Sequence, residues 1–581
     1  MPKPTPGSLP EWFEDAVPPA SYRSLFKWGA PDQFKHPNYG LVNYLKNALD
    51  LNDSGLGPIQ YPGLDPVPLD LPIQLGPSQA CFFESVVGAE NIRRDPYSRI
   101  KKSYGAGMID SLRLRRHRIE NIPDLVVAPR TKQEIATLIN YCSRQRLPVY
   151  VFGGGSTVTR GMEAVCGGIT LDMSQHLNQV VAFNETDQTI TVQAGMSGPQ
   201  LEAALNAAPE RYQAKRRYTC GHFPQSFEYS SVGGWIVTRG AGQNSTYYGK
   251  IEDLVISQEY VTPSGILRTA PFPRTATGPD LDQMMIGSEG VFGVLTEATL
   301  KISRLMPANR TRFCYMFHSW DTAVEAAREI MQSEAGFPSV FRLSDPEETE
   351  VAMNMYGLAK TPAETILKVL GFQPFQKVIL LGSTDGQKGY CRNVDRLVRK
   401  VCLSAGAFDL SLFGVTQRWE RDRFRDPYMR EDLQDHGILI DTLECAVNWS
   451  NLLQVHQTVR TFIKSHPQII CMTHLSHAYP QGANLYFIFI VKISSIKEYL
   501  DLQYGILESF QKSGAGISHH HGIGKQTAPW LEENIGKSAL DAIRALKAHF
   551  DPNGIMNPGG TLGLDLSPEQ RDKVWSKNLE G

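Results

Sequence analysis

The chain has 581 residues, with 58 Lys or Arg against 60 Asp or Glu and a formal net charge of −2. This balance argues against nucleic-acid binding through a global positive field, and the length predicts at least two domains. The nine cysteines form no CxxC pair, which argues against both a zinc ribbon and a disulfide framework.

The N-terminal segment, residues 1–112, is predicted to be an extended arm, because Pro, Gly and aromatic residues recur in it without a sustained period. Met1–Pro19 lacks the apolar stretch of a secretory signal, and Asn578–Gly581 does not match a peroxisomal signal. We therefore expect a cytoplasmic protein. The apolar run Leu485–Ile493 is too short to cross a bilayer, so any membrane contact is expected to be peripheral.

Residues 113–306 alternate between strand-like and helical patterns, which is typical of an α+β domain. A strand at Leu125–Val127 is followed by a helical pattern over Lys132–Arg146 and by a second strand at Val149–Phe152. Further strands, separated by glycine-rich turns, are predicted at Thr189–Val192, Leu254–Glu259 and Gly293–Thr299.

Residues 307–513 are predicted to form a second α+β domain, a cap that binds the substrate. This domain opens with a strand at Phe313–Phe317 and a helix over Asp321–Glu334. In the C-terminal segment, residues 514–581, good helix formers at Lys537–Phe550 predict a helix that stops before Asp551-Pro552. We expect this segment to fold back onto the first domain.

The first segment that carries chemistry is a strand running into Gly153-Gly154-Gly155-Ser156-Thr157. Three glycines and two hydroxyl residues let backbone N–H groups close on a phosphate, although a tight turn between strands is the alternative. A Rossmann site would need G-x-G-x-x-G at a helix start and an acidic residue about 20 positions later, and neither follows.

Glycine-rich segments recur in order after this loop, so several turns are expected to converge on one long ligand. Their order resembles the FAD-binding domain of the vanillyl-alcohol-oxidase superfamily, including its Gly-Ser-Glu-Gly turn at Gly287–Gly290. The resemblance implies a PCMH-type FAD-binding domain of two α/β subdomains with an α+β cap. Some members of the superfamily attach the flavin to a histidine in this loop; because Ser156–Thr159 contains no histidine, the resemblance implies noncovalent FAD. Gly153–Thr157 would hold the diphosphate, and the rest of FAD would be surrounded by Ser231, Gly233, Gly234, Arg239, Gly242, Glu289, Gly290 and Gly293.

Three consecutive histidines, His519, His520 and His521, precede Gly522-Ile523-Gly524. Neighbouring side chains of a strand point to opposite faces, so these three would not easily enter one metal sphere, and we expect no metal. The segment resembles the alkyldihydroxyacetonephosphate synthase family, whereas related hydroxyacid dehydrogenases carry Glu-His-Gly-Ile-Gly here. This resemblance makes His520 the expected acid or base partner. The alternative is a histidine satisfied by ordinary hydrogen bonds.

Three further candidates rest on the same resemblance. Tyr486 matches the synthase tyrosine that faces the flavin and replaces a metal-ligand histidine of the dehydrogenases; a core tyrosine is the alternative. Arg342 matches an arginine that points toward the substrate phosphate, with an ion pair to Asp345 as the alternative. His474 stands where the synthases have a second arginine, which leaves the substrate open.

The synthase resemblance implies a redox-neutral reaction of ether lipid synthesis, in which a fatty alcohol replaces the acyl chain of acyl-dihydroxyacetone phosphate. Tyr486 would be the acid or base and His520 its partner. The main rival is an FAD-linked dehydrogenase or oxidase of a 2-hydroxy acid or glycerol phosphate, and a noncatalytic flavoprotein is a third hypothesis. The expected partners are a lipid or phosphorylated small molecule and a second copy in a homodimer, and no nucleic acid.

Overall fold

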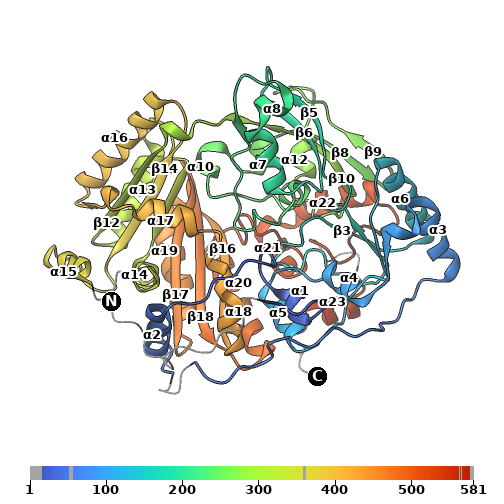
Figure 1. The fold of residues 1–581 in the computed structure, drawn as a ribbon, viewed down its shortest axis with the longest axis horizontal. Helices are drawn as coiled ribbons and strands as arrows, with labels where there is room; N and C mark the ends of the chain where they lie inside the picture. Colours follow the sequence, from blue (N-terminus) through green and yellow to red (C-terminus); the bar gives the residue numbers. More distant parts are fainter. Residues whose placement is uncertain (1–15, 52–55, 357–360, 562, 564–565, 576–581) are drawn as a thin grey trace.

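The structure is a computed structural model that describes residues 16–51, 56–356, 361–561, 563 and 566–575. Three larger β-sheets organise it, two in the first domain and one in the cap (Figure 1). Helices and strands are mixed in both domains, which confirms the predicted α+β class.

The first sheet has the order β1-β2-β4-β3 and is parallel except for β1. Helix α6 (Lys132–Gln145) packs on it through Ile135, Leu138 and Ile139 and ends at Arg146 in a left-handed conformation. This confirms the helix predicted over Lys132–Arg146. The strands are β1 (Ile92–Arg93), β2 (Leu125–Val127), β4 (Ile169–Asp172) and β3 (Val149–Phe152).

The second sheet is antiparallel, with the order β5-β6-β10-β8-β9. Its strands are β5 (Val180–Asn184), β6 (Thr189–Gln193), β10 (Val294–Lys301), β8 (Val255–Thr262) and β9 (Gly265–Arg268). Its core includes residues of α7 (Gly198–Asn206), α9 (Val232–Val237) and α11 (Ile251–Leu254). Other helices of this region are α8 (Ala208–Tyr212), α10 (Ser245–Tyr248) and α12 (Leu281–Met285).

The cap is a seven-stranded antiparallel sheet with the order β15-β12-β14-β13-β17-β18-β16. Alternation along β18 divides the two faces: Leu485, Phe487 and Phe489 enter the large apolar core, whereas Tyr486 and Ile488 point to the other side, where they line a cavity. The strands are β12 (Thr311–Phe317), β13 (Val340–Ser344), β14 (Val378–Thr384), β15 (Phe408–Asp409), β16 (Ile438–Asn448), β17 (Ile469–Tyr479) and β18 (Gly482–Lys492).

Helices cover both faces of the cap sheet. The core face carries α13 (Trp320–Gln332), α16 (Lys388–Ser404), α19 (Leu452–Lys464) and α20 (Ile496–Lys512). The remaining cap helices are α14 (Pro346–Met355), α15 (Pro362–Val369), α17 (Val415–Asp422) and α18 (Arg430–Asp435).

The described part of residues 1–112 is not simply an extended arm. It contributes strand β1 and helix α3 to the first sheet, where Phe83 and Val87 are fully buried, and it packs α2 against the cap core. Frequent Pro and Gly between short elements hid these helices from a periodicity argument. They are α1 (Tyr22–Phe26), α2 (Tyr39–Ala48), α3 (Pro77–Val87), α4 (Pro96–Lys101) and the start of α5 (Met108–Arg115).

The C-terminal segment contacts the first domain. Val149 of β3 exchanges two backbone hydrogen bonds with Ile555 and Asn557, which adds a parallel bridge at Met556. Helix α22 (Lys537–Phe550) packs on the second sheet and confirms the helix predicted there. Two more helices, α21 (Leu531–Ile535) and α23 (Pro568–Trp575), complete the segment.

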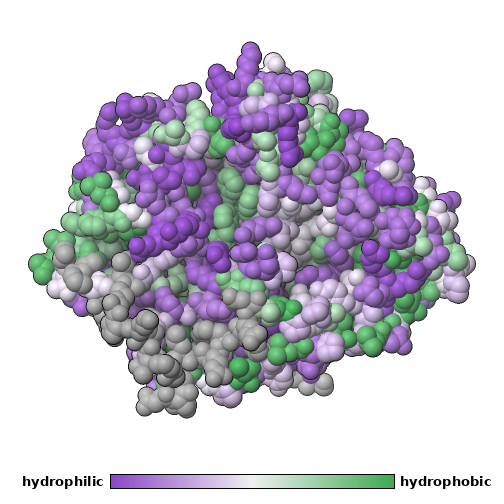
Figure 2. All heavy atoms as spheres, in the orientation of Figure 1, coloured by the Kyte–Doolittle hydropathy of each residue, from purple (hydrophilic) through white to green (hydrophobic). Residues whose placement is uncertain are grey.

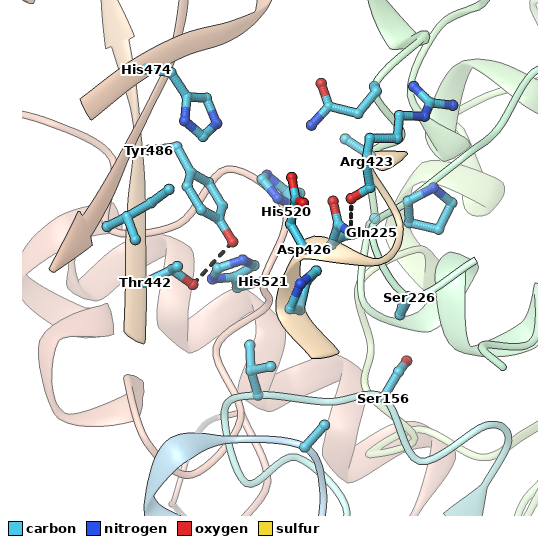
Figure 3. A pocket seen from close by; sticks show the side chains of 18 of the residues that line it. Ser156, Gln225, Ser226, Arg423, Asp426, Thr442, His474, Tyr486, His520 and His521 are labelled. Carbon is cyan, nitrogen blue, oxygen red and sulfur yellow. Dashed lines mark hydrogen bonds between the residues drawn. The ribbon is translucent and has the colours of Figure 1, made fainter. Parts of the chain in front are cut away.

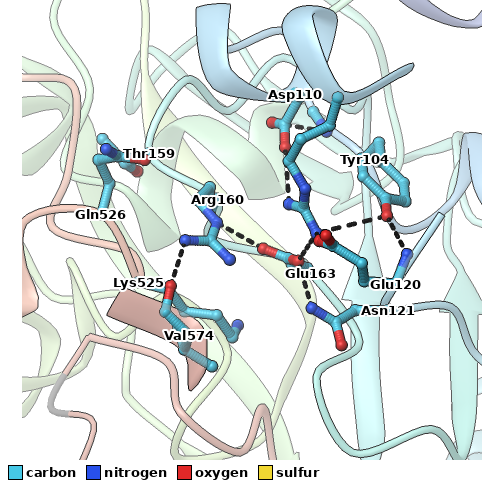
Figure 4. A network of polar contacts seen from close by, with 12 residues as sticks. Tyr104, Asp110, Glu120, Asn121, Thr159, Arg160, Glu163, Lys525, Gln526 and Val574 are labelled. Carbon is cyan, nitrogen blue, oxygen red and sulfur yellow. Dashed lines mark hydrogen bonds and ion pairs between the residues drawn. The ribbon is translucent and has the colours of Figure 1, made fainter. Parts of the chain in front are cut away.

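A buried ion network joins the arm, the first domain and α23 (Figure 4). Glu163 accepts hydrogen bonds from Arg113 at 2.8 Å and from Arg160 at 2.6 Å, and Arg160 also donates to the Val574 carbonyl at 2.7 Å. Burial alone would raise the pKa of Glu163, but the two guanidinium groups outweigh it and hold that pKa far below its ordinary value. Because Arg160 closely follows Gly153–Thr157, the network braces the base of that loop.

Candidate functional site

One cavity of about 720 Å³ lies between the first domain and the cap, and the arm and C-terminal segment also reach it. Figure 3 shows Ser156 and Ser226 on one side of it, and Tyr486 and His520 on the other. The volume is that of a site for a sizeable ligand.

The glycine loop after β3 forms one wall. Among the described residues, the backbone N–H groups of Gly154, Gly155, Ser156 and Thr157 donate no hydrogen bond to the protein, so they are available to a ligand. A Cβ on Gly153 would lie 2.2 Å from the Ser231 hydroxyl, and one on Gly154 2.2 Å from the Tyr229 carbonyl. Only glycine lets the loop approach α9 this closely, and the resulting cradle fits a diphosphate.

Most of the predicted residues meet at this cavity. They are Gly153, Gly154, Gly155, Ser156, Thr157, Ser231, Gly233, Gly234, Glu289, Gly290, Gly293, Arg342, His474, Tyr486, His520 and His521.

Arg239, Gly242 and His519 do not line the cavity. The Arg239 side chain is 44% exposed and bonds Gln283 and Glu252 instead. At Gly242, a Cβ would lie 2.3 Å from the Phe223 nitrogen, so this glycine serves close packing of two segments. His519 sits behind the wall, with Nε2 3.0 Å from the Tyr479 hydroxyl and Nδ1 3.0 Å from Nδ1 of His520.

Glu289 reaches the cavity, but its carboxylate is used elsewhere. It accepts the backbone N–H groups of Ile523 at 2.6 Å and Gly524 at 2.7 Å, and the Thr561 hydroxyl at 2.8 Å. The Gly-Ser-Glu-Gly turn therefore clamps the C-terminal segment onto the first domain.

The cap presents Tyr486 at the centre of a polar cluster. Its hydroxyl donates to Thr442 Oγ1 at 3.0 Å, and its ring stacks on His474 with centroids 4.8 Å apart. Residues 474 and 486 are direct partners in the β17–β18 pairing, which explains the stack. Burial raises the pKa of Tyr486, so the phenol is protonated at neutral pH.

Arg342 forms its ion pair with Glu348 and not with Asp345, the partner named in the predicted alternative. The Arg342–Glu348 distance is 2.6 Å, and Glu348 also lies 3.1 Å from Nδ1 of His474. Burial alone would raise the pKa of Glu348, but Arg342 and His474 outweigh it and lower that pKa to about 2. Burial and Arg342 lower the pKa of His474. A neutral His474 can donate through Nδ1 to Glu348 and accept through Nε2 from Arg342, 3.3 Å away.

The histidine triplet lies on a bend, not on a strand. The bend wraps the buried carboxylate of Glu444, which accepts the backbone N–H groups of His519, His520 and His521 at 2.8 to 3.0 Å and the Ser518 hydroxyl at 3.0 Å. The conformation brings His520 parallel to the Tyr486 ring at 5.9 Å and His521 edge-on at 5.4 Å.

The argument against a metal assumed that the three histidines lie on a strand, and this assumption is wrong. His477, His519 and His520 each offer a ring nitrogen, and these atoms lie within 4.8 Å of one another. Burial, with neighbouring cationic groups, lowers the pKa of all three, so each imidazole is neutral and able to hold a divalent cation. The expected absence of a metal stays a prediction.

The cap side of the cavity is largely apolar. Side chains from β12, β14, α14, α15 and the β15–α17 region enclose it, including Met316, Met353, Leu367, Ile379, Leu381, Phe408, Leu410 and Phe413. A polar centre at Tyr486 and His520 thus opens into space suited to hydrocarbon.

Glu348, Glu444, His477 and Thr442 were not predicted from the sequence. Each lies outside any motif: strands β16 and β17 bring Thr442, Glu444 and His477 to the site, and helix α14 brings Glu348. The nearest sequence signal is at Glu348, which lies in the first turn of α14, 6 residues after Arg342.

Comparison with known proteins finds two matching family models: "FAD binding domain" over residues 123–270 and "FAD linked oxidases, C-terminal domain" over residues 306–561. Alkyldihydroxyacetonephosphate synthase of Dictyostelium discoideum is 31% identical over 492 residues, covering 81% of this chain and 78% of that protein. A glycolate oxidase subunit of Bacillus subtilis is 26% identical, covering 83% and 96%. A solved structure of alkyldihydroxyacetonephosphate synthase aligns with a TM-score of 0.77 at 26% identity, covering 92% of this chain and 99% of that one.

Proposed function

Because this chain belongs to the FAD-linked oxidase family that includes the alkyldihydroxyacetonephosphate synthases, we propose that it is a synthase of this type. The reaction would convert acyl-dihydroxyacetone phosphate and a fatty alcohol into alkyl-dihydroxyacetone phosphate and a fatty acid. One observation carries the proposal: the polar centre at Tyr486 opens into an apolar space within a single cavity. A small 2-hydroxy acid needs no such space, whereas two lipid chains do.

The residues of the chain fit definite tasks in this reaction. The N–H groups of Gly154–Thr157 would hold the FAD diphosphate, and bound FAD would supply an electrophilic ring for the exchange. Tyr486, protonated and held by Thr442, would give a proton to the departing carboxylate, and neutral His520 would take one from the entering alcohol. The enclosing apolar wall would exclude water, which otherwise competes with the alcohol.

We expect the FAD to be noncovalent. The loop Ser156–Thr159 contains no histidine or cysteine, and no cysteine occurs among the described residues that line the cavity. Release of all flavin into the supernatant on acid precipitation would support this, and flavin retained in the pellet would refute it.

A specific observation favours the rival, a dehydrogenase or oxidase, in its 2-hydroxy acid form over its glycerol phosphate form. Glu348 already forms an ion pair with the Arg342 guanidinium, and the lowered pKa of His474 leaves that imidazole neutral. A dianionic phosphate would therefore bind more weakly here than at a site with two arginines. In this reaction, His520 would remove the hydroxyl proton.

One experiment separates the two candidates. The purified protein is mixed anaerobically with palmitoyl-dihydroxyacetone phosphate and hexadecanol, and products are followed by mass spectrometry beside the flavin spectrum. Alkyl product without net flavin bleaching supports the synthase. Absence of exchange, together with bleaching by a hydroxy acid or glycerol phosphate, supports the rival.

A lipid substrate also bears on the predicted membrane contact. Figure 2 shows hydrophobic residues gathered over α15, and Val369, Leu412 and Phe413 are 83%, 99% and 70% exposed. Leu367 and Leu410, which flank these residues in the chain, share one buried cluster, so the exposed side chains lie close to the apolar cavity wall. None of the helices in the described ranges has the length and apolarity needed to cross a bilayer. Peripheral contact and the homodimer stay predictions.

A further inference from the structure

The bend that carries the three histidines is held from both domains. Glu444 of the cap strand β16 binds its first half, Ser518 to His521, and Glu289 of the first domain binds Ile523 and Gly524 directly after it. Two carboxylates therefore define where this short segment lies between the domains.

The Glu444 contact is a specific anion site made of backbone. Three successive N–H groups and one hydroxyl converge on a side chain that is 0% exposed, and such a concave set of donors selects an anion. Hydrogen bonds to a carboxylate are roughly twice as strong as neutral ones. A glutamine would place N–H groups against N–H groups and lose part of this set.

Strand pairing links this site to the phenol. Glu444 and Tyr486 are direct partners in the β16–β18 pairing, so the residue that holds the bend and the residue that the bend approaches share one rigid rung of the sheet. The same bend sets His520 parallel to Tyr486 and His521 edge-on to it.

We propose that Glu444 is the positioning residue that holds His520 and His521 in register with Tyr486. It acts through the backbone of the bend, and its Oε2 lies 3.6 Å from Nδ1 of His520. The assignment rests on the proposed function only in that Tyr486 and His520 are taken as the reacting pair; the clamp itself holds for either candidate reaction.

The test removes the carboxylate and then returns it. In Glu444→Ala the missing atoms correspond to acetate, which can enter through the cavity because His520 and His521 line it. We expect FAD to be retained and turnover to fall roughly 100-fold, as for loss of a positioned proton-transfer group. Acetate should restore at least about a tenth of the wild-type rate, whereas acetamide, which has the same shape without the charge, should not.

The matched control is Glu202→Ala. Glu202 also accepts a backbone N–H, from Cys220 at 2.8 Å, and a hydroxyl, from Thr219 at 3.0 Å, but these partners do not line the cavity, whereas His520 and His521 do. Turnover in this variant should stay within about twofold of the wild type. If Glu444→Ala does not fold, the isosteric Glu444→Gln takes its place, with Glu444→Asp as the charge-retaining comparison.

Hydrogen–deuterium exchange of the peptide spanning residues 518–524 gives a readout that needs no substrate. Protected amides in the wild type, faster exchange in Glu444→Ala and renewed protection with acetate support the clamp. Equal exchange in wild type and variant overturns it, as does turnover within about threefold of the wild type. Turnover is measured in whichever reaction the wild type performs. If the wild type does not replace the acyl chain by the alcohol, the proposed function is refuted, and hydrogen–deuterium exchange alone decides whether Glu444 holds the bend.

Discussion

Replacing Tyr486 with Phe isolates one hydroxyl group. The ring would keep its stack on His474 and its contacts with His520 and His521, and the structural loss is one hydrogen bond of 3.0 Å to Thr442. Such a bond contributes about 1 kcal/mol to stability, which is small against the roughly 5–15 kcal/mol by which domains are stable. Loss of a positioned proton donor slows a reaction about 100- to 10,000-fold, or about 3 to 5 kcal/mol of barrier. We therefore expect a folded, yellow, nearly inactive enzyme.

The assay compares Tyr486→Phe with Thr442→Val, which removes the acceptor and leaves the phenol. FAD content and melting temperature should match the wild type in both variants, within a few degrees for the latter, whereas kcat should collapse only in Tyr486→Phe. Turnover of Tyr486→Phe within about twofold of the wild type would show that the phenol transfers no proton, and the mechanism above would fail.

Three further outcomes follow from the structure. Gly154→Val should abolish flavin retention, since even its Cβ would lie 2.2 Å from the Tyr229 carbonyl; a purified variant with the wild-type ratio of absorbance at 450 and 280 nm would contradict the cradle. Stability should fall as pH drops from 7.5 to 5, because burial lowers the pKa of His477, His519 and His520, and that of His222 to about 3, while the unfolded chain binds protons near pH 6.5. Buried carboxyls whose pKa values are raised, among them Glu202, Glu289 and, at about 6, Asp110 and Asp441, act in the opposite direction, so a melting temperature that is flat or rises toward pH 5 would refute the dominance of the imidazoles. Leu412→Ser combined with Val369→Ser should weaken sedimentation with phosphatidylcholine vesicles at least about tenfold and leave turnover of detergent-dispersed substrate intact; unchanged sedimentation would exclude this surface as the membrane contact.

Local patterns predicted the elements that carry their own signals. The helices at Lys132 and Lys537 begin where expected, because good formers and clear stops mark them. The strand predicted to end at Glu259 instead continues to Thr262, since its pairing with β10 extends the ladder. The helices of the N-terminal segment were missed, because their burial depends on surfaces supplied by distant parts of the chain.

The residues of the site that belong to local sequence motifs could be predicted, whereas those placed by strand register or helix packing could not. The glycine loop, Tyr486 and the histidines are visible as local strings, and they do meet at one cavity. Glu444 and Glu348 carry no local signature, since their meaning comes from a strand register and from a helix packed on β13 and β17. Arg239 illustrates the opposite error: it lies inside a glycine-rich stretch, yet its side chain turns toward solvent.

The backbone bonds between Val149 and residues 555–557 have a consequence for how this protein is made in the cell. Strand β3, which leads directly into the glycine loop, is synthesised about 400 residues before its neighbour on one side, since Val149 bridges to Met556. Contacts of such sequence separation form late and slow the search for the native state. The nascent first domain must therefore wait with an open sheet edge while these residues are made, a period in which a chaperone or early FAD would protect it from aggregation.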